Sequence, residues 1–165
     1  MSFAARRRWK PFAVGGLCAL AIASLGGALT DLSPWYENLA KPAWQPPDWA
    51  FGPAWTIIFA LCAYSFGLAW QAARTFKTRL TIAWFFAFNM FLNVTWSWLF
   101  FTLQRPDYAL VEVVLLWLSV LALIVALRPI SKRASLALVP YLVWVGFAGV
   151  LNLAVVRLNA PFGAG

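Results

Sequence analysis

The chain has 165 residues, of which 63% are hydrophobic and 11% are charged, whereas a soluble domain normally carries about 25% charged residues. This composition excludes a protein with a water-facing surface on all sides, so lipid must be the solvent for most of the chain. The net charge of +8 does not indicate nucleic-acid binding, because the basic residues stand in short clusters that form no continuous face for a phosphate backbone. The length suits one domain, spanning residues 1–165.

Five apolar segments predict an all-α integral membrane protein, a bundle of five transmembrane helices. Each segment reaches roughly the 20 residues that a helix needs to cross about 30 Å of hydrocarbon, where every backbone group must be paired within the segment. The first run is longer than the roughly 7 to 15 residues of a signal-peptide core, so we expect it to be retained. The predicted spans cover residues 11–30, 51–73, 80–104, 108–127 and 134–156.

The distribution of Lys and Arg predicts a cytoplasmic N-terminus. Four basic residues precede the first span, and three more follow each of the second and fourth spans. The opposite side has only Lys41, Arg105 and Arg157. Because cytoplasmic loops carry the excess of positive charge, we expect the first loop and the C-terminus to lie outside, in a bacterial cell membrane.

The first span carries a stripe of small residues at a spacing of four, namely Gly15, Ala19, Ala23 and Gly27. Such a stripe lets another helix approach closely. Packing within the monomer and a dimer interface are both consistent with it, and we favour packing within the monomer.

The loop between the first two spans is about 20 residues long and rich in proline and aromatic residues. A loop of this length in a compact domain is usually functional, but tryptophan and tyrosine also anchor chains at the membrane interface. Both interpretations stay open on the sequence alone. The prolines and aromatic residues are Pro34, Trp35, Tyr36, Pro42, Trp44, Pro46, Pro47 and Trp49.

Four residues of the third span, Asn89, Asn93, Trp96 and Phe100, fall on one helical face. Asparagine in hydrocarbon needs a hydrogen-bonding partner. The two residues could simply join neighbouring helices, or Asn93 and Trp96 could line a cavity, which we favour. Trp55 lies near the start of the second span, on the same side of the membrane as Trp96 and Phe100.

Two further residues in the spans are chemically unusual. Glu112 is the only charged side chain within a predicted span, and we expect the nearby helix N-terminus to stabilise its charge. Pro140 lies in the interior of the fifth span, where it should remove a backbone hydrogen bond and kink the helix. The kink could open a groove beside Tyr141 and Trp144, or reflect ordinary bundle packing.

No conventional catalytic or metal site is predicted. The chain has no histidine and only two cysteines, Cys18 and Cys62, both within apolar runs. This excludes a Ser-His-Asp triad and leaves no zinc-type ligand set. We therefore expect no required cofactor.

Three stretches resemble the TspO/translocator protein family, also called the tryptophan-rich sensory proteins or peripheral-type benzodiazepine receptors. The first is WYENLAKPAWQPP at residues 35–47, followed by Trp49, Phe51, Pro53 and Trp55. The second joins Asn89, Asn93 and Trp96 to Phe100-Phe101, and the third runs from Pro140-Tyr141-Leu142-Val143-Trp144 through Leu151-Asn152 to Arg157-Leu158-Asn159. The resemblance covers roughly residues 11–159.

The resemblance implies five helices around a pocket covered by the first loop. It implies binding of porphyrins such as protoporphyrin IX, of other tetrapyrroles and of synthetic isoquinoline carboxamides, and a homodimer. It also implies light-dependent porphyrin breakdown that depends on Trp55 and Trp144. The expected pocket, with Trp96 added from its place on the helix face, comprises Tyr36, Pro47, Trp55, Asn93, Trp96, Ser97, Trp144 and Ala148.

Three functions are therefore consistent with the sequence: a tetrapyrrole-binding sensor or regulator, a transporter of tetrapyrroles or other apolar molecules, and a light-dependent porphyrin-degrading enzyme. We favour the sensor. Sterol binding through the pattern of the family's animal members is not expected, because Leu153 occupies the position of the required tyrosine before Arg157.

Overall fold

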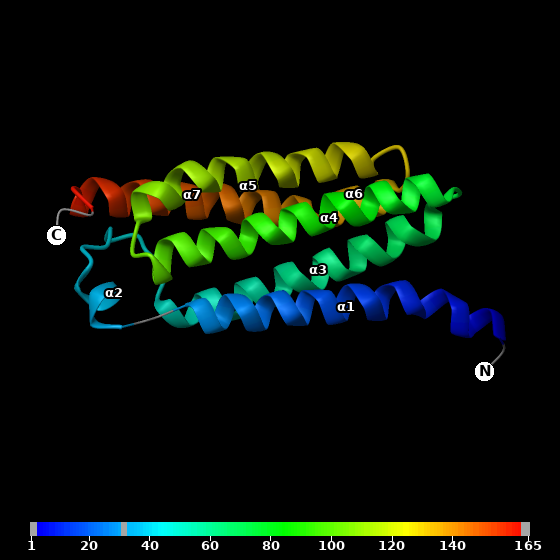
Figure 1. Ribbon diagram of the computed structural model, residues 1–165, viewed down its shortest axis with the longest axis horizontal. Helices are drawn as coiled ribbons and strands as arrows, with labels where there is room; N and C mark the ends of the chain where they lie inside the picture. The colour runs from blue at the N-terminus through cyan, green and yellow to red at the C-terminus, as the bar shows by residue number, and fades with distance from the viewer. Residues whose placement is uncertain (1–2, 31–32, 163–165) are drawn as a thin grey trace.

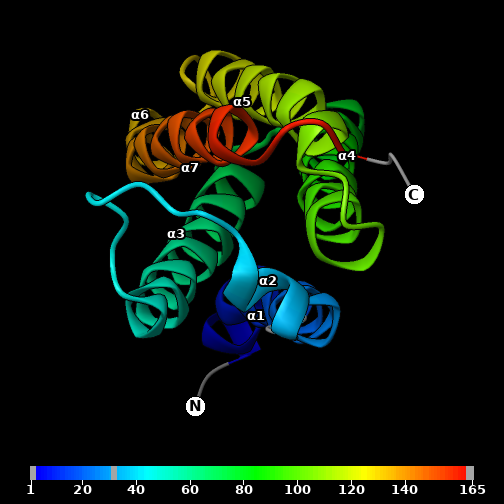
Figure 2. The same ribbon diagram turned by 90° about the vertical axis from the view of Figure 1, so that its left-hand side faces the viewer.

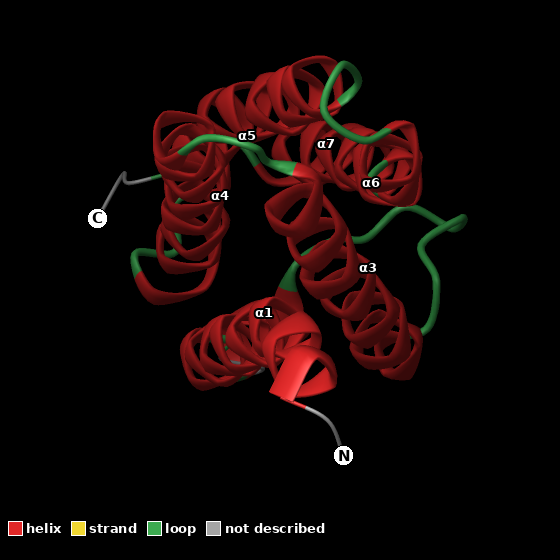
Figure 3. Cartoon of the chain, turned by 90° about the vertical axis from the view of Figure 1, so that its right-hand side faces the viewer, coloured by secondary structure: helices red, strands yellow, loops and turns green. Residues whose placement is uncertain are grey.

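The computed structural model describes residues 3–30 and 33–162, and within these ranges the chain forms helices and loops without a strand (Figure 3). The predicted all-α class is confirmed. In chain order the elements are α1 (Phe3–Leu29), α2 (Pro34–Asn38), η1 (Asp48–Ala50), α3 (Phe51–Ala72), α4 (Phe76–Ser97), η2 (Trp98–Thr102), α5 (Pro106–Leu127), α6 (Lys132–Ala137) and α7 (Val139–Asn159).

Five helical stretches are long and apolar enough to cross a membrane, which confirms the predicted number of spans. Their ends differ from the predicted boundaries by at most four residues. The protein is therefore a multi-pass membrane protein. The stretches are Trp9–Leu29, Asp48–Ala72, Phe76–Thr102, Pro106–Leu127 and Lys132–Asn159.

The last stretch corrects the expectation for Pro140. Instead of kinking the interior of one helix, the chain interrupts the helix at Leu138 and begins α7 at Val139, with Pro140 in its first turn. Proline is favourable there because its missing N–H would have no intrahelical partner. The lost backbone hydrogen bond therefore separates α6 from α7.

The long helices form a ring (Figures 1 and 2). α1 packs on α3, α3 on α6, the α6–α7 unit on α5, and α5 on α4, which contacts α1 again. The described part of loop one (residues 33–50), the α4–α5 connection and the last turn of α7 lie together at what we call the loop-one end (Figure 1). The N-terminus and the α3–α4 and α5–α6 connections lie at the opposite, N-terminal end.

The half of the bundle at the N-terminal end is held together by two serine hydrogen bonds and an apolar core. Two buried serines join its helices: Ser65 Oγ donates to the Ala134 carbonyl at 2.8 Å, and Ser135 Oγ donates to the Ile124 carbonyl at 2.7 Å. Between these contacts lies an apolar core that includes Cys62, Ala69, Ala73, Ile82, Phe86, Leu123, Leu127, Ala134 and Leu138. These contacts hold the helices in place where they continue to the loop-one end.

The small-residue stripe of α1 serves packing within the monomer in its first half. A Cβ atom added at Gly15 would lie 3.0 Å from the carbonyl oxygen of Ala63 in α3. Ala19, the next residue of the stripe, is buried. Towards the loop-one end, a Cβ at Gly27 would meet no atom within 4 Å, so the stripe does not continue as a tight helix contact.

Glu112 departs from its expected environment. It is the seventh residue of α5, beyond the first turn in which free backbone N–H groups and the helix dipole favour a negative charge. The side chain is only 6% exposed, and neither carboxyl oxygen has a hydrogen-bond partner among the described residues. The expected stabilisation by the helix N-terminus is therefore wrong.

Candidate ligand-binding site

A cavity of about 560 Å³ occupies the half of the bundle below loop one. Its walls come from α1, α3, α4, η2 and α7, and loop one contributes the roof. Small-molecule sites typically measure roughly 300 to 1,000 Å³ and are mostly apolar with a few placed polar groups. Seven of the eight residues expected from the sequence line it, namely Tyr36, Trp55, Asn93, Trp96, Ser97, Trp144 and Ala148.

One side of the cavity is an aromatic surface that we call the α3–α7 wall, made of Phe51, Trp55, Phe59 and Trp144. The rings of Trp55 and Phe59 stack with centroids 5.4 Å apart and planes at 26°. Trp55 meets Trp144 edge to face, with centroids 6.3 Å apart and planes at 84°. These contacts hold each ring in a fixed orientation.

A second aromatic surface, the α4 wall, consists of Trp96, Phe100 and Phe101. Trp96 and Phe100 stack at 5.1 Å and 27°, and the rings of Phe100 and Phe101 lie 4.9 Å apart. Tyr36 of α2 adds a contact to Phe101 at 5.7 Å. Since α4 and α3 stand on different sides of the ring of helices (Figure 2), the cavity lies between two aromatic walls.

The two asparagines of α4 take different roles. Asn89 Nδ2 donates to Ser119 Oγ of α5 at 2.8 Å and does not line the cavity. Asn93 Nδ2 donates to the hydroxyl of Tyr141 in α7 at 3.2 Å and does line it. Asn89 therefore joins two helices, whereas Asn93 combines this role with a place in the cavity wall.

Asn152 secures α7 to the beginning of α5. With its amide oriented to satisfy both partners, Nδ2 donates to the Pro106 carbonyl and Oδ1 accepts from the Leu110 N–H, each at 3.0 Å. By contrast, the buried indole nitrogens of Trp96 and Trp144 have no hydrogen-bond partner among the described residues. The cavity walls thus retain two unpaired N–H donors.

The α1 side of the cavity is formed by small residues, Ala23, Gly26, Gly27 and Thr30. A Cβ atom at either glycine would meet nothing within 4 Å. Absence of larger side chains here keeps the space between the aromatic walls open.

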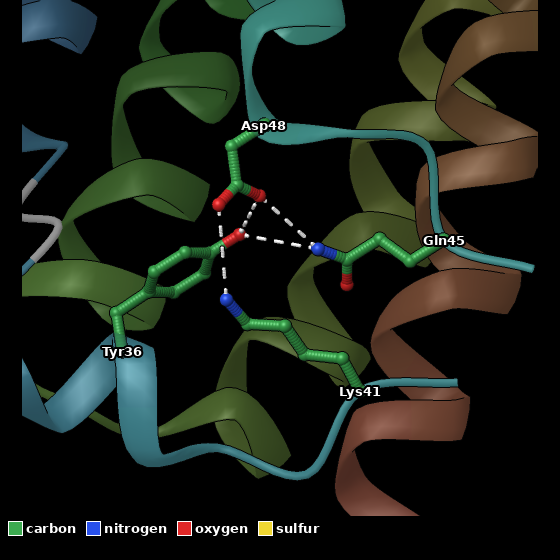
Figure 4. A network of polar contacts seen from close by, with 4 residues as sticks. All are labelled: Tyr36, Lys41, Gln45 and Asp48. Atoms are coloured by element: carbon green, nitrogen blue, oxygen red, sulfur yellow. Dashed lines mark hydrogen bonds and ion pairs between the residues drawn. The ribbon is translucent and has the colours of Figure 1, made fainter. Parts of the chain in front are cut away.

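A network of four polar residues makes the roof (Figure 4). The Tyr36 hydroxyl donates to Asp48 Oδ1 at 2.9 Å, and Gln45 Nε2 donates to the same oxygen at 3.2 Å. Lys41 Nζ lies 3.9 Å from Asp48 Oδ2 and 3.7 Å from the centre of the Tyr36 ring. Burial and the hydrogen bond to Asp48 raise the pKa of Tyr36 to about 12, so its hydroxyl stays a donor at neutral pH.

Loop one is also tied to the end of α7. The Ala40 N–H donates to Asn159 Oδ1, and Asn159 Nδ2 donates to the Ala40 carbonyl, both at 2.8 Å. This reciprocal pair joins positions 119 residues apart. It holds the roof against the helix that carries Trp144 and Ala148.

Two other aromatic residues of loop one, Trp44 and Trp49, are consistent with the interfacial role. Trp49 is 77% exposed, and Trp44 is also exposed while its ring contacts Phe147 at 5.9 Å. Neither lines the cavity. Pro47, the eighth expected pocket residue, is exposed and not part of the lining, and instead accepts the Ala50 N–H at 2.8 Å at the start of η1. Loop one therefore combines a cavity roof with an exposed aromatic rim.

Two charged residues of the lining were not expected from the sequence. Lys41 and Asp48 are the two charged residues of the lining within the described ranges. Their presence in a loop rich in proline and aromatic residues was the available signal. In the same part of the chain, no three His, Cys, Asp or Glu side chains lie close enough to hold a metal ion.

The chain is similar to known proteins over most of its length. The profile of the TspO/MBR family matches residues 14–158. The tryptophan-rich protein TspO of Chlorobaculum tepidum is 41% identical over 151 residues, covering 87% of this chain and 92% of that protein. The tryptophan-rich sensory protein of Cereibacter sphaeroides is 35% identical (87% and 88% covered), and the translocator protein of Sus scrofa is 33% identical (84% and 86% covered).

Proposed function

The chain belongs to the TspO/MBR family, and from that premise we propose that it is a membrane sensor that binds a porphyrin or related tetrapyrrole in the cavity below loop one. Related proteins carry the names sensory protein and translocator protein, which supports a role in sensing or moving a ligand. The lining of the cavity supports the choice of a flat, largely apolar ligand.

The observation that carries the proposal is the pair of aromatic walls. The side chains of Trp55, Trp144, Trp96 and Phe100 line one cavity of about 560 Å³. Aromatic faces stack well on flat conjugated systems, and a tetrapyrrole is a flat conjugated system. The chain has no histidine, so such a ligand is held by its faces and edges.

Removing one aromatic residue from a wall should weaken the complex measurably. We expect Trp144→Ala to weaken binding of protoporphyrin IX by about 2 kcal/mol, roughly 30-fold, because truncating an aromatic anchor typically costs that much. Asn93→Ala should cost about 1 kcal/mol through one lost polar contact. Porphyrin absorption titrations of the detergent-solubilised protein measure both.

The matched control is Trp84→Ala, which removes an exposed indole of α4 far from the cavity lining. The affinity of the Trp84→Ala variant for protoporphyrin IX should equal that of the wild type. Unchanged affinity in both Asn93→Ala and Trp144→Ala would contradict binding in this cavity.

We also propose that the loop-one end faces away from the cytoplasm. Ten of the 13 basic residues lie near the start of α1, in the first turns of α4 and α6 or in the connections beside them, all at the N-terminal end, and the positive-inside rule places that end in the cytoplasm. Reporter fusions should show the α3–α4 and α5–α6 connections inside the cell and loop one outside. Labelling of loop one from the cytoplasm alone would reverse the assignment.

The homodimer remains part of the proposal. Because Gly15 and Ala19 of the small-residue stripe are used within the monomer, a dimer would need another helix face.

A sensor should return its ligand unchanged, whereas a transporter should release it across the membrane, so reconstituted vesicles loaded with porphyrin distinguish the two.

A further inference from the structure

We propose that the N-terminal end of the bundle binds the headgroup of an anionic phospholipid at what we call the α4 basic cluster, made of Arg74, Lys77 and Arg79. The ligand class is a membrane amphiphile with a phosphate group and a net negative charge. The cluster lies at the opposite end of the bundle from loop one (Figure 1), so the inference does not depend on which molecule the cavity binds.

Charge is divided unevenly between the two ends of the bundle. Both ion pairs among the described residues involve loop one or the start of α5. The basic side chains at the N-terminal end have no described carboxylate beside them, so the anion that neutralises them must come from elsewhere. All four acidic residues of the described ranges belong to loop one or to the first seven residues of α5, namely Glu37, Asp48, Asp107 and Glu112.

The α4 basic cluster also lies at the depth of the lipid phosphates. The membrane-spanning stretch begins at Phe76, and Lys77 and Arg79 belong to the first turn of α4. Arg74 precedes that turn in the α3–α4 connection. Basic residues at the end of a span are attracted to anionic headgroups, and each one adds to the attraction. The lipid is therefore the nearest source of the missing negative charge.

An exposed apolar stripe continues from the cluster along α4. Phe76, Leu80 and Trp84 follow one another at a spacing of four, so they share a helix face, and they are 80%, 47% and 67% exposed. A phosphate bound beside Lys77 would have its acyl chains next to this stripe. A soluble acidic protein would have to cover the same apolar side chains, which lie within a membrane-spanning stretch. The surface therefore fits an amphiphile better than a soluble partner.

Arg79 is held in place by an aromatic contact with the neighbouring helix. Its guanidinium carbon lies 5.9 Å from the centre of the Trp70 ring in α3, and Trp70 packs on Phe66 with ring centroids 5.3 Å apart. The buried Nε atom of Arg79 has no hydrogen-bond partner among the described residues. No acceptor at this position competes with a ligand, and the two Nη groups remain for phosphate oxygens, which guanidinium binds well.

A second cluster at the same end of the bundle offers an internal comparison. This α6 basic cluster has the same number of charges, but no cation–π contact of its side chains is found in the described part of the chain. We expect it to attract anions in general without forming a headgroup site. Its members are Arg128, Lys132 and Arg133.

The test measures which lipid stays bound to the purified, detergent-solubilised protein. Native mass spectrometry with equimolar dioleoylphosphatidylglycerol and dioleoylphosphatidylcholine, which have the same acyl chains, gives the ratio of the two one-lipid complexes. The wild type should favour the anionic lipid by about fivefold, which corresponds to roughly 1 kcal/mol. The ratio should fall towards one in the triple variant Arg74→Gln, Lys77→Gln, Arg79→Gln. The matched triple variant Arg128→Gln, Lys132→Gln, Arg133→Gln loses the same charge from the same end and should keep most of the preference.

A second variant separates lipid binding from folding. Arg74 and Lys77 are exposed, so Arg74→Gln with Lys77→Gln leaves the Arg79–Trp70 contact intact and should still lower the ratio at unchanged thermal stability. Equal ratios in the two triple variants would show that overall charge, and not the α4 basic cluster, determines the preference. A wild type that binds both lipids equally would also overturn the inference. If it then binds a soluble poly-glutamate peptide through the same three residues, the surface belongs to an acidic protein partner.

Discussion

A single large side chain that fills the cavity should greatly weaken porphyrin binding. We expect Ala148→Trp to lower the affinity by at least about 100-fold, or roughly 2.7 kcal/mol. Ala148 lines the cavity one turn of α7 beyond Trp144. An indole at this position would occupy the space between the two aromatic walls. Because it extends into open volume rather than into a packed core, the fold should tolerate it. Porphyrin absorption titration of the detergent-solubilised variant measures this loss of affinity.

The control for this substitution is Val150→Trp, on the same helix two residues further along. Val150 is 58% exposed and not part of the lining, so its indole should face lipid and leave binding unchanged. Equal thermal stability of the two variants would show that the effect at Ala148 is local. Wild-type affinity in Ala148→Trp would mean that the ligand binds elsewhere.

The fold could be predicted closely because it depends on segment length and hydrophobicity. A lipid-exposed segment has one efficient way to pair its backbone, so residues 80–104, which carry no charge, had to form a helix, and α4 with η2 covers nearly the same range. Such reasoning needs no knowledge of what each side chain contacts.

The two structural predictions that were wrong concern positions whose structure depends on contacts with other parts of the chain. Pro140 was assigned to a helix interior because hydrophobicity continues on both sides of it, but the chain ends α6 at Ala137 and restarts at Val139. Glu112 was expected near a helix N-terminus, but α5 begins at Pro106, so Glu112 is its seventh residue, buried and without a hydrogen-bond partner among the described residues. Boundaries and burial follow from neighbours that the local sequence does not reveal.

The site was predictable where residues lie on helices and less so on loop one. Asn93 and Trp96 were expected from their shared helical face and Ser97 from the family resemblance, and all three line the cavity. Loop one has no such periodicity. Its course is fixed by Asn159, which is 119 residues from Ala40. That long-range contact helps explain why Lys41 and Asp48 were missed and why Pro47, which was expected in the pocket, is not in its lining.

The indoles of Trp55 and Trp144 both border the cavity and could react with a porphyrin that is excited by light. Trp55 and Trp144 come from different helices, meet edge to face with centroids 6.3 Å apart, and both border the space proposed for the ligand. An excited porphyrin can exchange an electron with a nearby indole or transfer its energy to oxygen. The protein would contribute proximity and partial exclusion of water. We propose light-dependent breakdown of the porphyrin as a second activity of this cavity.

That activity should depend on the indoles more strongly than binding does. In Trp55→Phe and Trp144→Phe we expect protoporphyrin IX to bind within a few-fold of wild type, because phenylalanine still stacks, while the rate of breakdown falls by about tenfold or more, a barrier change of roughly 1.4 kcal/mol, because phenylalanine is far harder to oxidise. The measurement is the decay of porphyrin absorption under fixed illumination, with darkness and oxygen removal each stopping the reaction. Trp84→Phe, on the exposed face of α4, controls for loss of any tryptophan and should react as fast as wild type. Equal rates in wild type, Trp55→Phe and Trp144→Phe would show that the two indoles only pack against the ligand, and the degrading activity should then be abandoned in favour of the sensor.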